Sequence, residues 1–135
     1  MASIHQEVFI GVPAAKLWDA MRDIGALHTR LVPGFVTDCR IEDGGAARTV
    51  TFANGLVARE LIVDLDDQAR RIAWSAPGGR LSHYNASAQV FEDGPQRCRV
   101  VWIADLLPHE MAPAIAGMIG QGLTAMKAAA ESAAT

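Results

Sequence analysis

The sequence has little of what marks several large classes of protein. Among its 135 residues are two cysteines, Cys39 and Cys98, which form no CxxC pair and lie near no group of histidines. We therefore expect two free thiols rather than a disulfide framework or a zinc site. The arginines are scattered and the net charge is −3, so no basic surface for nucleic acid is predicted.

Long apolar runs are also missing. The first six residues carry no positive charge followed by a continuous apolar segment, and charge, glycine or proline interrupts the later apolar stretches. Neither a secretory signal nor a membrane-spanning helix is therefore expected. We expect a cytoplasmic protein without stable membrane insertion, present as a monomer or weak homodimer, whose residues 1–135 form one domain.

Motifs of common catalytic sites are absent as well. The sequence has no GxSxG, HExxH, P-loop or GxGxxG segment. Ser82 and His83 are neighbours in a predicted strand, so their side chains point to opposite faces of the sheet and cannot pair. The four histidines lack the spacing of metal ligands. We expect neither a metal nor a cofactor.

What the sequence does contain is a series of strand patterns between helical segments. The pattern predicts a strand over 3–10, helices over 13–22 and 24–31, six strands over 35–42, 47–53, 56–65, 71–76, 81–92 and 97–107, and a helix from 109 to about 133. No helix-length segment interrupts the six strands, so the sheet should be antiparallel. The predicted fold class is α+β.

The last predicted helix is too narrow to cover this sheet by itself. It measures about 10 Å across, against roughly 30 Å for seven strands, so the sheet must curl around it and pockets can remain beside it. Ala86 and Ala88 would leave space on one strand face, and Gly117, Gly120 and Gly122 remove side chains from the helix. Close packing explains these small residues as well as a pocket does.

The predicted turn at Asn54-Gly55 decides which neighbouring side chains face the helix. Asn-Gly favours a two-residue type I′ hairpin turn. With that turn, one sheet face carries Thr49, Thr51, Ala58 and Glu60, and the other carries Val50, Phe52, Val57, Arg59 and Leu61. The hydrophobic pattern alone would bury the second set, together with its arginine.

Several short segments form a recognisable series: the run from Ile10 to Asp19, Asp23-Ile24-Gly25, Glu60-Leu61 with Asp66, Trp102, and Asp105-Leu106-Leu107-Pro108. In this order, and over essentially the whole chain, the sequence resembles the START-like superfamily (SRPBCC), in particular its polyketide cyclase/dehydrase and lipid-transport branch. That superfamily includes the major birch pollen allergen and the plant abscisic acid receptors. The resemblance implies a helix-grip fold, in which a curved seven-stranded antiparallel sheet wraps around a long C-terminal helix and two short helices separate strands 1 and 2.

The resemblance also implies which residues line a ligand cavity. They are Ala58, Glu60, Trp74, Leu81, Tyr84 and Ala86 on the sheet, with Met118 and Gly122 on the last helix. The resemblance thus places Glu60 inside, against the hydrophobic pattern, and we follow it. The hormone receptors have a proline-containing gate loop where this chain has Phe52-Ala53-Asn54-Gly55, and a histidine before Arg80-Leu81 that is missing here. Hormone reception is therefore not implied.

Three polar residues are candidates for catalysis: Glu60, Tyr84 and Asp105. A carboxylate inside an apolar cavity holds a proton more tightly, so Glu60 could act as acid or base, although a solvated surface position fits the sequence equally well. Tyr84 could present its hydroxyl to a ligand or be an ordinary core tyrosine. Asp105 could lie inside, cap the last helix or lie on the surface.

Three functions are compatible with these expectations. The first is binding or carriage of an apolar small molecule, such as a lipid, polyketide or aromatic compound, between the sheet and the last helix. The second is an enzyme of the polyketide cyclase/dehydrase kind, in which polar groups of the cavity move protons. The third is an interaction or stability module without a ligand. The sequence alone does not decide among them.

Overall fold

The computed structural model describes residues 2–133 of the chain. Its elements are β1 (Ala2–Ile10), α1 (Ala14–Arg22), a π-helical turn η1 (Leu27–Leu31), β2 (Val36–Glu42), a 3-10 turn η2 (Asp43–Gly45), β3 (Ala47–Phe52), β4 (Val57–Asp66), β5 (Arg71–Ser75), β6 (His83–Glu92), β7 (Cys98–Leu107), a 3-10 turn η3 (His109–Met111) and α2 (Ala112–Ala133). This is the predicted order of elements.

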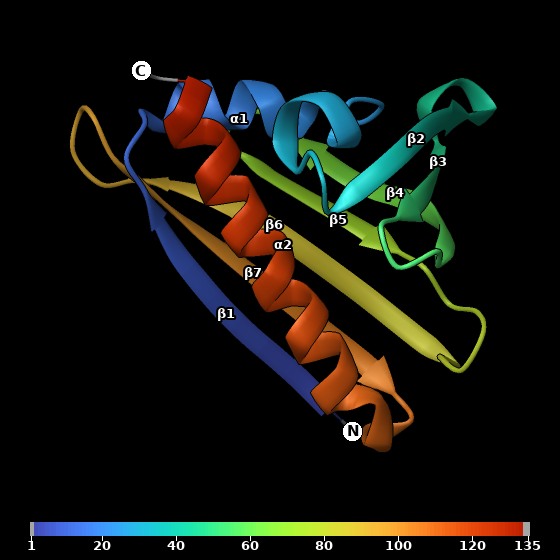
Figure 1. Cartoon of the computed structure of the whole chain (residues 1–135). Helices are drawn as coiled ribbons and strands as arrows, with labels where there is room; N and C mark the ends of the chain where they lie inside the picture. The colour runs from blue at the N-terminus through green and yellow to red at the C-terminus, as the bar shows by residue number, and fades with distance from the viewer. Residues whose placement is uncertain (1, 134–135) are drawn as a thin grey trace.

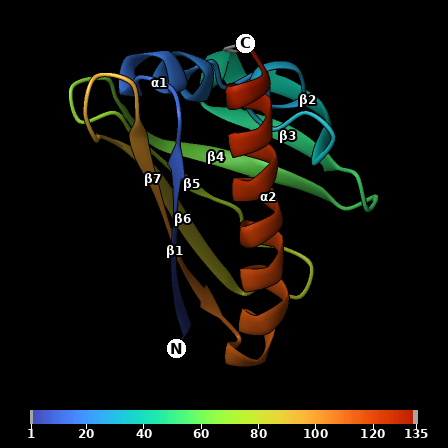
Figure 2. The same cartoon turned by 60° about the vertical axis from the view of Figure 1, so that its left-hand side comes forward.

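The seven strands form one antiparallel sheet in the order β1-β7-β6-β5-β4-β3-β2. The sheet is curved, and α2 runs across its concave side (Figure 1, Figure 2). The short helices α1 and η1 lie at the end of the sheet where α2 finishes. The predicted helix-grip fold is confirmed. No helix within residues 2–133 is long and apolar enough to cross a membrane.

The first helix forms because one of its faces is apolar. Proline at position 13 precedes its first turn, where a missing N–H costs nothing. This face carries Leu17 and Trp18 and, about one turn later, Met21. All three side chains are buried against the sheet. The indole N–H of Trp18 donates to Asp67 in the turn between β4 and β5, at 2.9 Å. This contact attaches α1 to the turn between β4 and β5.

The turn between β3 and β4 differs from the predicted two-residue type I′ turn. Three residues, 53–55, form the loop: the N–H of Phe52 donates to the carbonyl of Leu56 at 2.8 Å, and the N–H of Gly55 donates back to Phe52 at 2.9 Å. Gly55 has a φ of 92°, whereas Asn54 keeps an ordinary φ and accepts a hydrogen bond from the N–H of Leu56. The extra loop residue shifts the register by one position.

This shift corrects the predicted faces. Val50 pairs with Ala58, and Arg48 pairs with Glu60, directly across the two strands. Directly paired residues point to the same side, so β3 turns the side chains at 48, 50 and 52 inward, with 58 and 60 of β4. The hydrophobic pattern is therefore right for β3 and the resemblance is right for β4.

Two tryptophans explain the small residues on β6. Trp74 on β5 pairs with Ala86, and Trp102 on β7 pairs with Ala88. The two indole rings meet edge to face, with centroids 5.6 Å apart. An alanine opposite each indole leaves the volume that the ring needs. Close packing, rather than an opening, thus accounts for Ala86.

Candidate functional site

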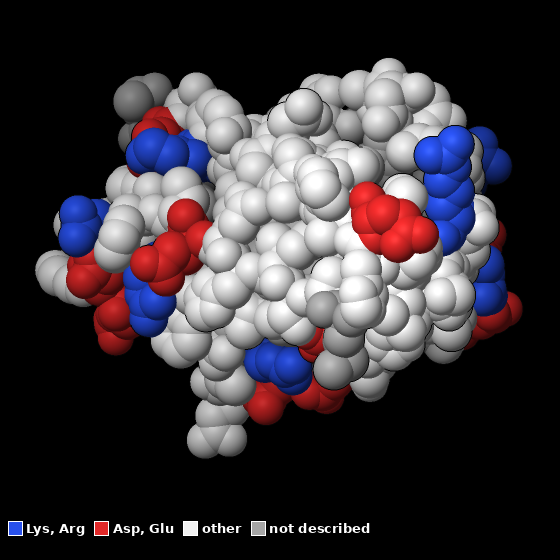
Figure 3. Space-filling model, turned by 90° about the horizontal axis from the view of Figure 1, so that it is seen from below, with Lys and Arg blue, Asp and Glu red and all other residues white. Residues whose placement is uncertain are grey.

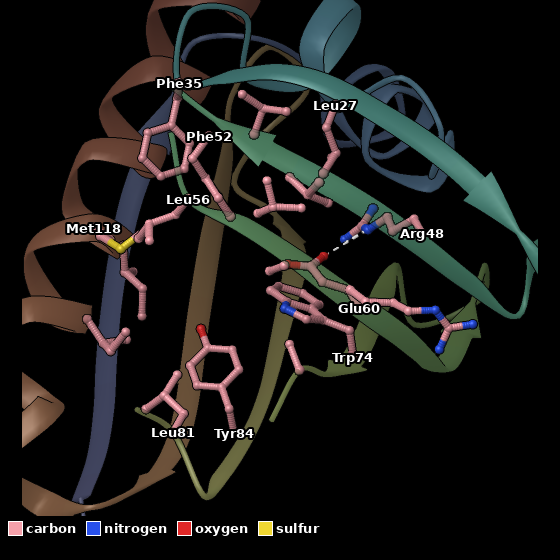
Figure 4. Close-up of a pocket in the computed structure, with 18 of the residues that line it drawn as sticks. Leu27, Phe35, Arg48, Phe52, Leu56, Glu60, Trp74, Leu81, Tyr84 and Met118 are labelled. Carbon is pink, nitrogen blue, oxygen red and sulfur yellow. Dashed lines mark hydrogen bonds and ion pairs between the residues drawn. The ribbon is translucent and has the colours of Figure 1, made fainter. Parts of the chain in front are cut away.

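A pocket of about 720 Å³ lies between α2 and the curved half of the sheet. Its walls are mostly apolar: η1 and the segment after it supply Leu27 and Phe35, the sheet supplies Val50 and Phe52, and α2 supplies Ile115 and Met118. Figure 4 shows these walls closing around an interior into which the Tyr84 hydroxyl and the Glu60 carboxylate point. The pocket arises because α2 covers β1 and β7 more closely than it covers β3 and β4.

The pocket opens between two loops and the first turn of α2. Leu56 and Val57 at the β3–β4 turn, the loop from 77 to 80 before β6, and Ala114 at the start of α2 all line it and are exposed. The side chains of Leu56 and Val57 remain 55% and 62% exposed, so the rim on that side is apolar. Seen from the end where α2 begins, the molecule is largely uncharged in its centre, with charges toward its margins (Figure 3).

Six of the eight residues expected to line a ligand cavity do line this pocket: Ala58, Glu60, Trp74, Leu81, Tyr84 and Met118. They come from β4, β5, the loop before β6, β6 itself and α2. Segments distant in the sequence thus meet at one place, as the resemblance implied. Their role in binding a ligand remains a prediction.

The other two expected lining residues lie in packed surroundings. Ala86 is 5% exposed and fills the space beneath Trp74. A Cβ atom built on Gly122 would lie 3.2 Å from the rings of Phe35 and of Trp102, so this glycine allows α2 to approach two aromatic rings. Neither residue is among those that line the pocket.

The third candidate for catalysis, Asp105, lies outside the pocket. It is exposed on the outer face of β7 and accepts a hydrogen bond from the hydroxyl of Ser3 on β1. The neighbouring residues Ala104 and Leu106 are buried, and the strand alternates. Asp105 therefore links two strands on the convex side and takes no part in the site.

The polar part of the pocket is an ion pair that the sequence analysis missed. Arg48 donates through Nε to Glu60 Oε1 at 2.9 Å, and the two side chains are only 4% and 9% exposed. The guanidinium also donates to the backbone carbonyl of Ile24 at 3.3 Å and lies 5.7 Å from the centre of the Trp74 ring. The alternation of Arg48 with Val50, together with the correct register, would have revealed the pair.

Tyr84 and the tryptophans add neutral donors. Burial, and after it the nearby charge of Glu60, raise the pKa of Tyr84 far above its ordinary value, so its phenol stays protonated. The Nε1 atoms of Trp74 and Trp102 are buried and find no hydrogen-bond partner within residues 2–133. Trp102 lies near enough to the Tyr84 hydroxyl to favour the phenolate slightly, without completing a hydrogen bond to it.

The histidine, acidic and cysteine side chains are the groups that a metal site or a reactive thiol would use. In the described part of the chain, no three histidine, cysteine or acidic side chains are placed so that they could hold a metal ion together. Cys39 and Cys98 are buried and free. Burial, with a smaller contribution from Asp93, raises the pKa of Cys98 to about 11, which keeps this thiol protonated and unreactive at neutral pH.

The fold and the pocket together define a helix-grip protein with an apolar interior. The chain belongs to the family described as "Polyketide cyclase / dehydrase and lipid transport", whose sequence profile matches residues 1–131. No curated protein sequence matches the chain.

Solved structures share the fold. XoxI from Bacillus cereus has a TM-score of 0.86 at 20% identity, over 100% of this chain and 99% of that one. BexL, a di-domain ARO/CYC protein from the BE-7585A biosynthetic pathway, has a TM-score of 0.84 at 14% identity, over 97% of this chain and 47% of that one. A point mutant of norcoclaurine synthase from Thalictrum flavum has a TM-score of 0.77 at 20% identity, over 99% and 96% of the two chains. At these identities the likeness is one of fold.

Proposed function

We propose that this protein binds and carries an apolar small molecule, of the lipid, polyketide or aromatic kind, in the pocket between α2 and the sheet. The observation that supports this most directly is the pocket itself: about 720 Å³, walled by apolar side chains and containing a single buried ion pair. Small-molecule sites have volumes of about 300–1,000 Å³ and few polar groups, which orient the ligand. The two buried free thiols fit a cytoplasmic location, which belongs to the same proposal.

Native mass spectrometry tests the proposal directly. The freshly purified protein should carry a co-purified small molecule, or should take up naphthalene after organic extraction. Ala58→Phe places a ring in the pocket and should abolish uptake, because Ala58 lines it. Ala128→Phe makes the same change at an exposed position of α2 and should leave uptake intact. If neither the fresh nor the extracted protein binds any such compound, the ligand-free module becomes the better description.

A second function, an enzyme of the cyclase/dehydrase kind, is favoured by one observation. Glu60 and Tyr84 point into the same apolar interior, with the carboxylate close enough to raise the pKa of the phenol. Such a pair could remove a proton from a folded chain and hydrogen-bond to the oxygen beside it.

The substitution Glu60→Gln separates the two functions. For a carrier, a neutral ligand whose hydroxyl donates to the Glu60 carboxylate should bind more weakly by about 1–2 kcal/mol, and a ligand without a donor should lose less. For an enzyme, affinity for a synthetic poly-β-keto thioester should hold while its cyclisation, followed by mass spectrometry, slows roughly a hundredfold or more. Unchanged product formation in the variant would exclude Glu60 as the group that moves the proton.

A further inference from the structure

We propose that the ligand of this pocket is uncharged and presents a carbonyl oxygen to the interior, and that the pocket excludes carboxylates. This rests on the proposed function, since it specifies the polar end of the apolar molecule that the pocket holds. Two observations carry it: the buried arginine is already neutralised, and a buried donor faces the pocket without an acceptor.

The first step concerns charge. Arg48 has its positive charge balanced by Glu60 at 2.9 Å, and no further charged side chain is buried in residues 2–133. An incoming carboxylate would lose its hydration, would meet the negative charge of Glu60, and would find no free cation inside. A neutral ligand meets none of these costs.

The cations at the rim do not change this balance. Arg59 is half exposed and paired with Glu42 and Asp43. Arg80 lies on the exposed loop before β6, in contact with water. Exposed cations attract an anion only weakly, because water and salt screen them.

The second step concerns the unpaired donor. Trp74 is 5% exposed, and its Nε1 has no hydrogen-bond acceptor among the residues that the structure describes. Figure 4 shows its indole nitrogen turned toward the interior of the pocket. An indole N–H is a donor only, so its partner must be an acceptor. The ring of Trp102 has its centre 5.6 Å from that of Trp74, and its Nε1 also lacks a hydrogen-bond partner in the described structure, although it lies near the Tyr84 hydroxyl.

The neighbouring hydroxyl matches the same acceptor. Tyr84 remains a protonated phenol, because burial and the charge of Glu60 disfavour its anion. Its hydroxyl points into the pocket from β6, across from Met118 on α2 (Figure 4). An oxygen with two lone pairs and no charge, that of a ketone, aldehyde or ester, fits this set of donors. A carboxylate offers the same lone pairs but brings a charge that the site does not balance.

Two probes of nearly equal shape test the charge. 2-Acetonaphthone and 2-naphthoate differ in a methyl group against an oxygen anion, and naphthalene has neither. By calorimetry at about pH 8, the ketone should bind at least roughly tenfold tighter than the carboxylate. Affinity for the acid should rise about tenfold per pH unit as the pH falls toward its pKa of about 4, because the neutral form enters. Ketone affinity should stay constant. Carboxylate binding that equals ketone binding and ignores pH overturns the proposal.

Three variants test which side chains cause the preference for the ketone over the carboxylate. Trp74→Phe removes the donor together with part of the ring, so naphthalene reports the loss of ring contact, and the ketone should weaken roughly fivefold to tenfold more than naphthalene does. Trp18→Phe makes the same change outside the pocket and should affect neither probe. Glu60→Gln exposes the charge of Arg48, so naphthoate should tighten about tenfold or more and lose its pH dependence. If Glu60→Gln does not fold, the pH dependence of the natural protein still decides the question.

The outcomes separate this inference from the proposed function. If naphthalene, the ketone and the acid all bind alike, apolar binding stands and the inference of a carbonyl ligand is wrong. If none of the three binds, the proposed function fails and the inference fails with it. Selective binding of the ketone, reduced by Trp74→Phe, supports both.

Discussion

At the scale of single residues, the stability of this protein depends on keeping Arg48 and Glu60 together. Both side chains are almost fully buried, and each is the other's charged partner. Arg48→Met would leave Glu60 buried without its cation, so we expect the free energy of unfolding to fall by about 3–5 kcal/mol. Urea denaturation at neutral pH, followed by tryptophan fluorescence, measures the loss.

The double variant Arg48→Met/Glu60→Met is the control for that prediction. It removes both charges and keeps the volume apolar, which in buried ion pairs is often neutral or stabilising. The double variant should therefore be more stable than Arg48→Met alone. A single variant as stable as the natural protein would show that the carboxylate finds water or another donor inside the pocket.

The same two residues show what a sequence can and cannot reveal about a site. Glu60 was a candidate because the resemblance placed it on the inner face of its strand. Arg48 was not, because the assumed two-residue turn put it across from a different residue. The Ala53–Gly55 loop adds one residue and brings Arg48 opposite Glu60. An Asn-Gly pair is compatible with both a two-residue and a three-residue hairpin loop, and the choice between them determines which residue lies opposite Glu60.

At the scale of elements, one carboxylate adds a polar link between α1 and the sheet to the burial of the apolar face of α1. Asp67 accepts hydrogen bonds from Trp18 at 2.9 Å and from Arg22 at 2.7 Å and 3.2 Å. Arg22, and then Trp18, lower the pKa of Asp67 from 3.8. A lowered pKa means that this stabilisation is present above the unfolded-state value and is lost as the pH falls through the folded-state value.

Asp67→Asn tests this attachment. The variant should melt at a lower temperature than the natural protein at neutral pH, because the charged hydrogen bonds to Arg22 are lost. The difference in Tm should shrink as the pH is lowered below about 4, where Asp67 of the natural protein takes up its proton. Circular dichroism melts across this range supply the measurement. A difference in Tm that is constant with pH would mean that the charge of Asp67 contributes nothing.

The glycines of α2 give a second prediction at this scale. A Cβ atom at Gly117 would meet nothing within 4 Å in the described structure, whereas one at Gly122 would meet Phe35 and Trp102 at 3.2 Å. Gly117→Ala should stabilise the protein by about 0.5–1 kcal/mol, since alanine is the better helix former. Gly122→Ala should gain less or lose stability, because two rings must move. Equal gains in urea denaturation would show that the rings yield freely.

Element order and strand positions were within reach of the sequence, because alternation and turn residues are local signals. The reasons for the small residues could not be predicted from the sequence. In a sequence, Ala86 and Gly122 look the same whether they border an empty space or contact an aromatic ring. Only the pairing of Trp74 with Ala86, and the approach of α2 to Trp102, show that both positions are filled by aromatic neighbours. These contacts join segments distant in the chain, and no local pattern records them.

At the scale of the whole molecule, the pocket follows from the mismatch between one helix and seven strands. α2 packs on β1 at one edge of the sheet, while β2, β3 and β4 curl forward at the other edge (Figure 2). The space between is closed by η1 at one end and remains open at the loops beside the start of α2. The two ends of the pocket therefore differ: buried polar groups lie at its inner wall, and apolar side chains lie at its rim.

A ligand in this pocket joins the helix to the curled strands, so binding should stabilise the whole fold. At a ligand concentration about a hundred times the Kd, mass action adds about 2.7 kcal/mol, which for a chain of this length raises the Tm by several degrees. With 2-acetonaphthone, differential scanning calorimetry should show this increase, growing with the logarithm of ligand concentration. Ala58→Phe should remove the increase, and Ala128→Phe should retain it. An increase that survives in Ala58→Phe would place the bound molecule on the outer surface of the protein, and a Tm independent of concentration would mean that the pocket takes up no ligand of this kind.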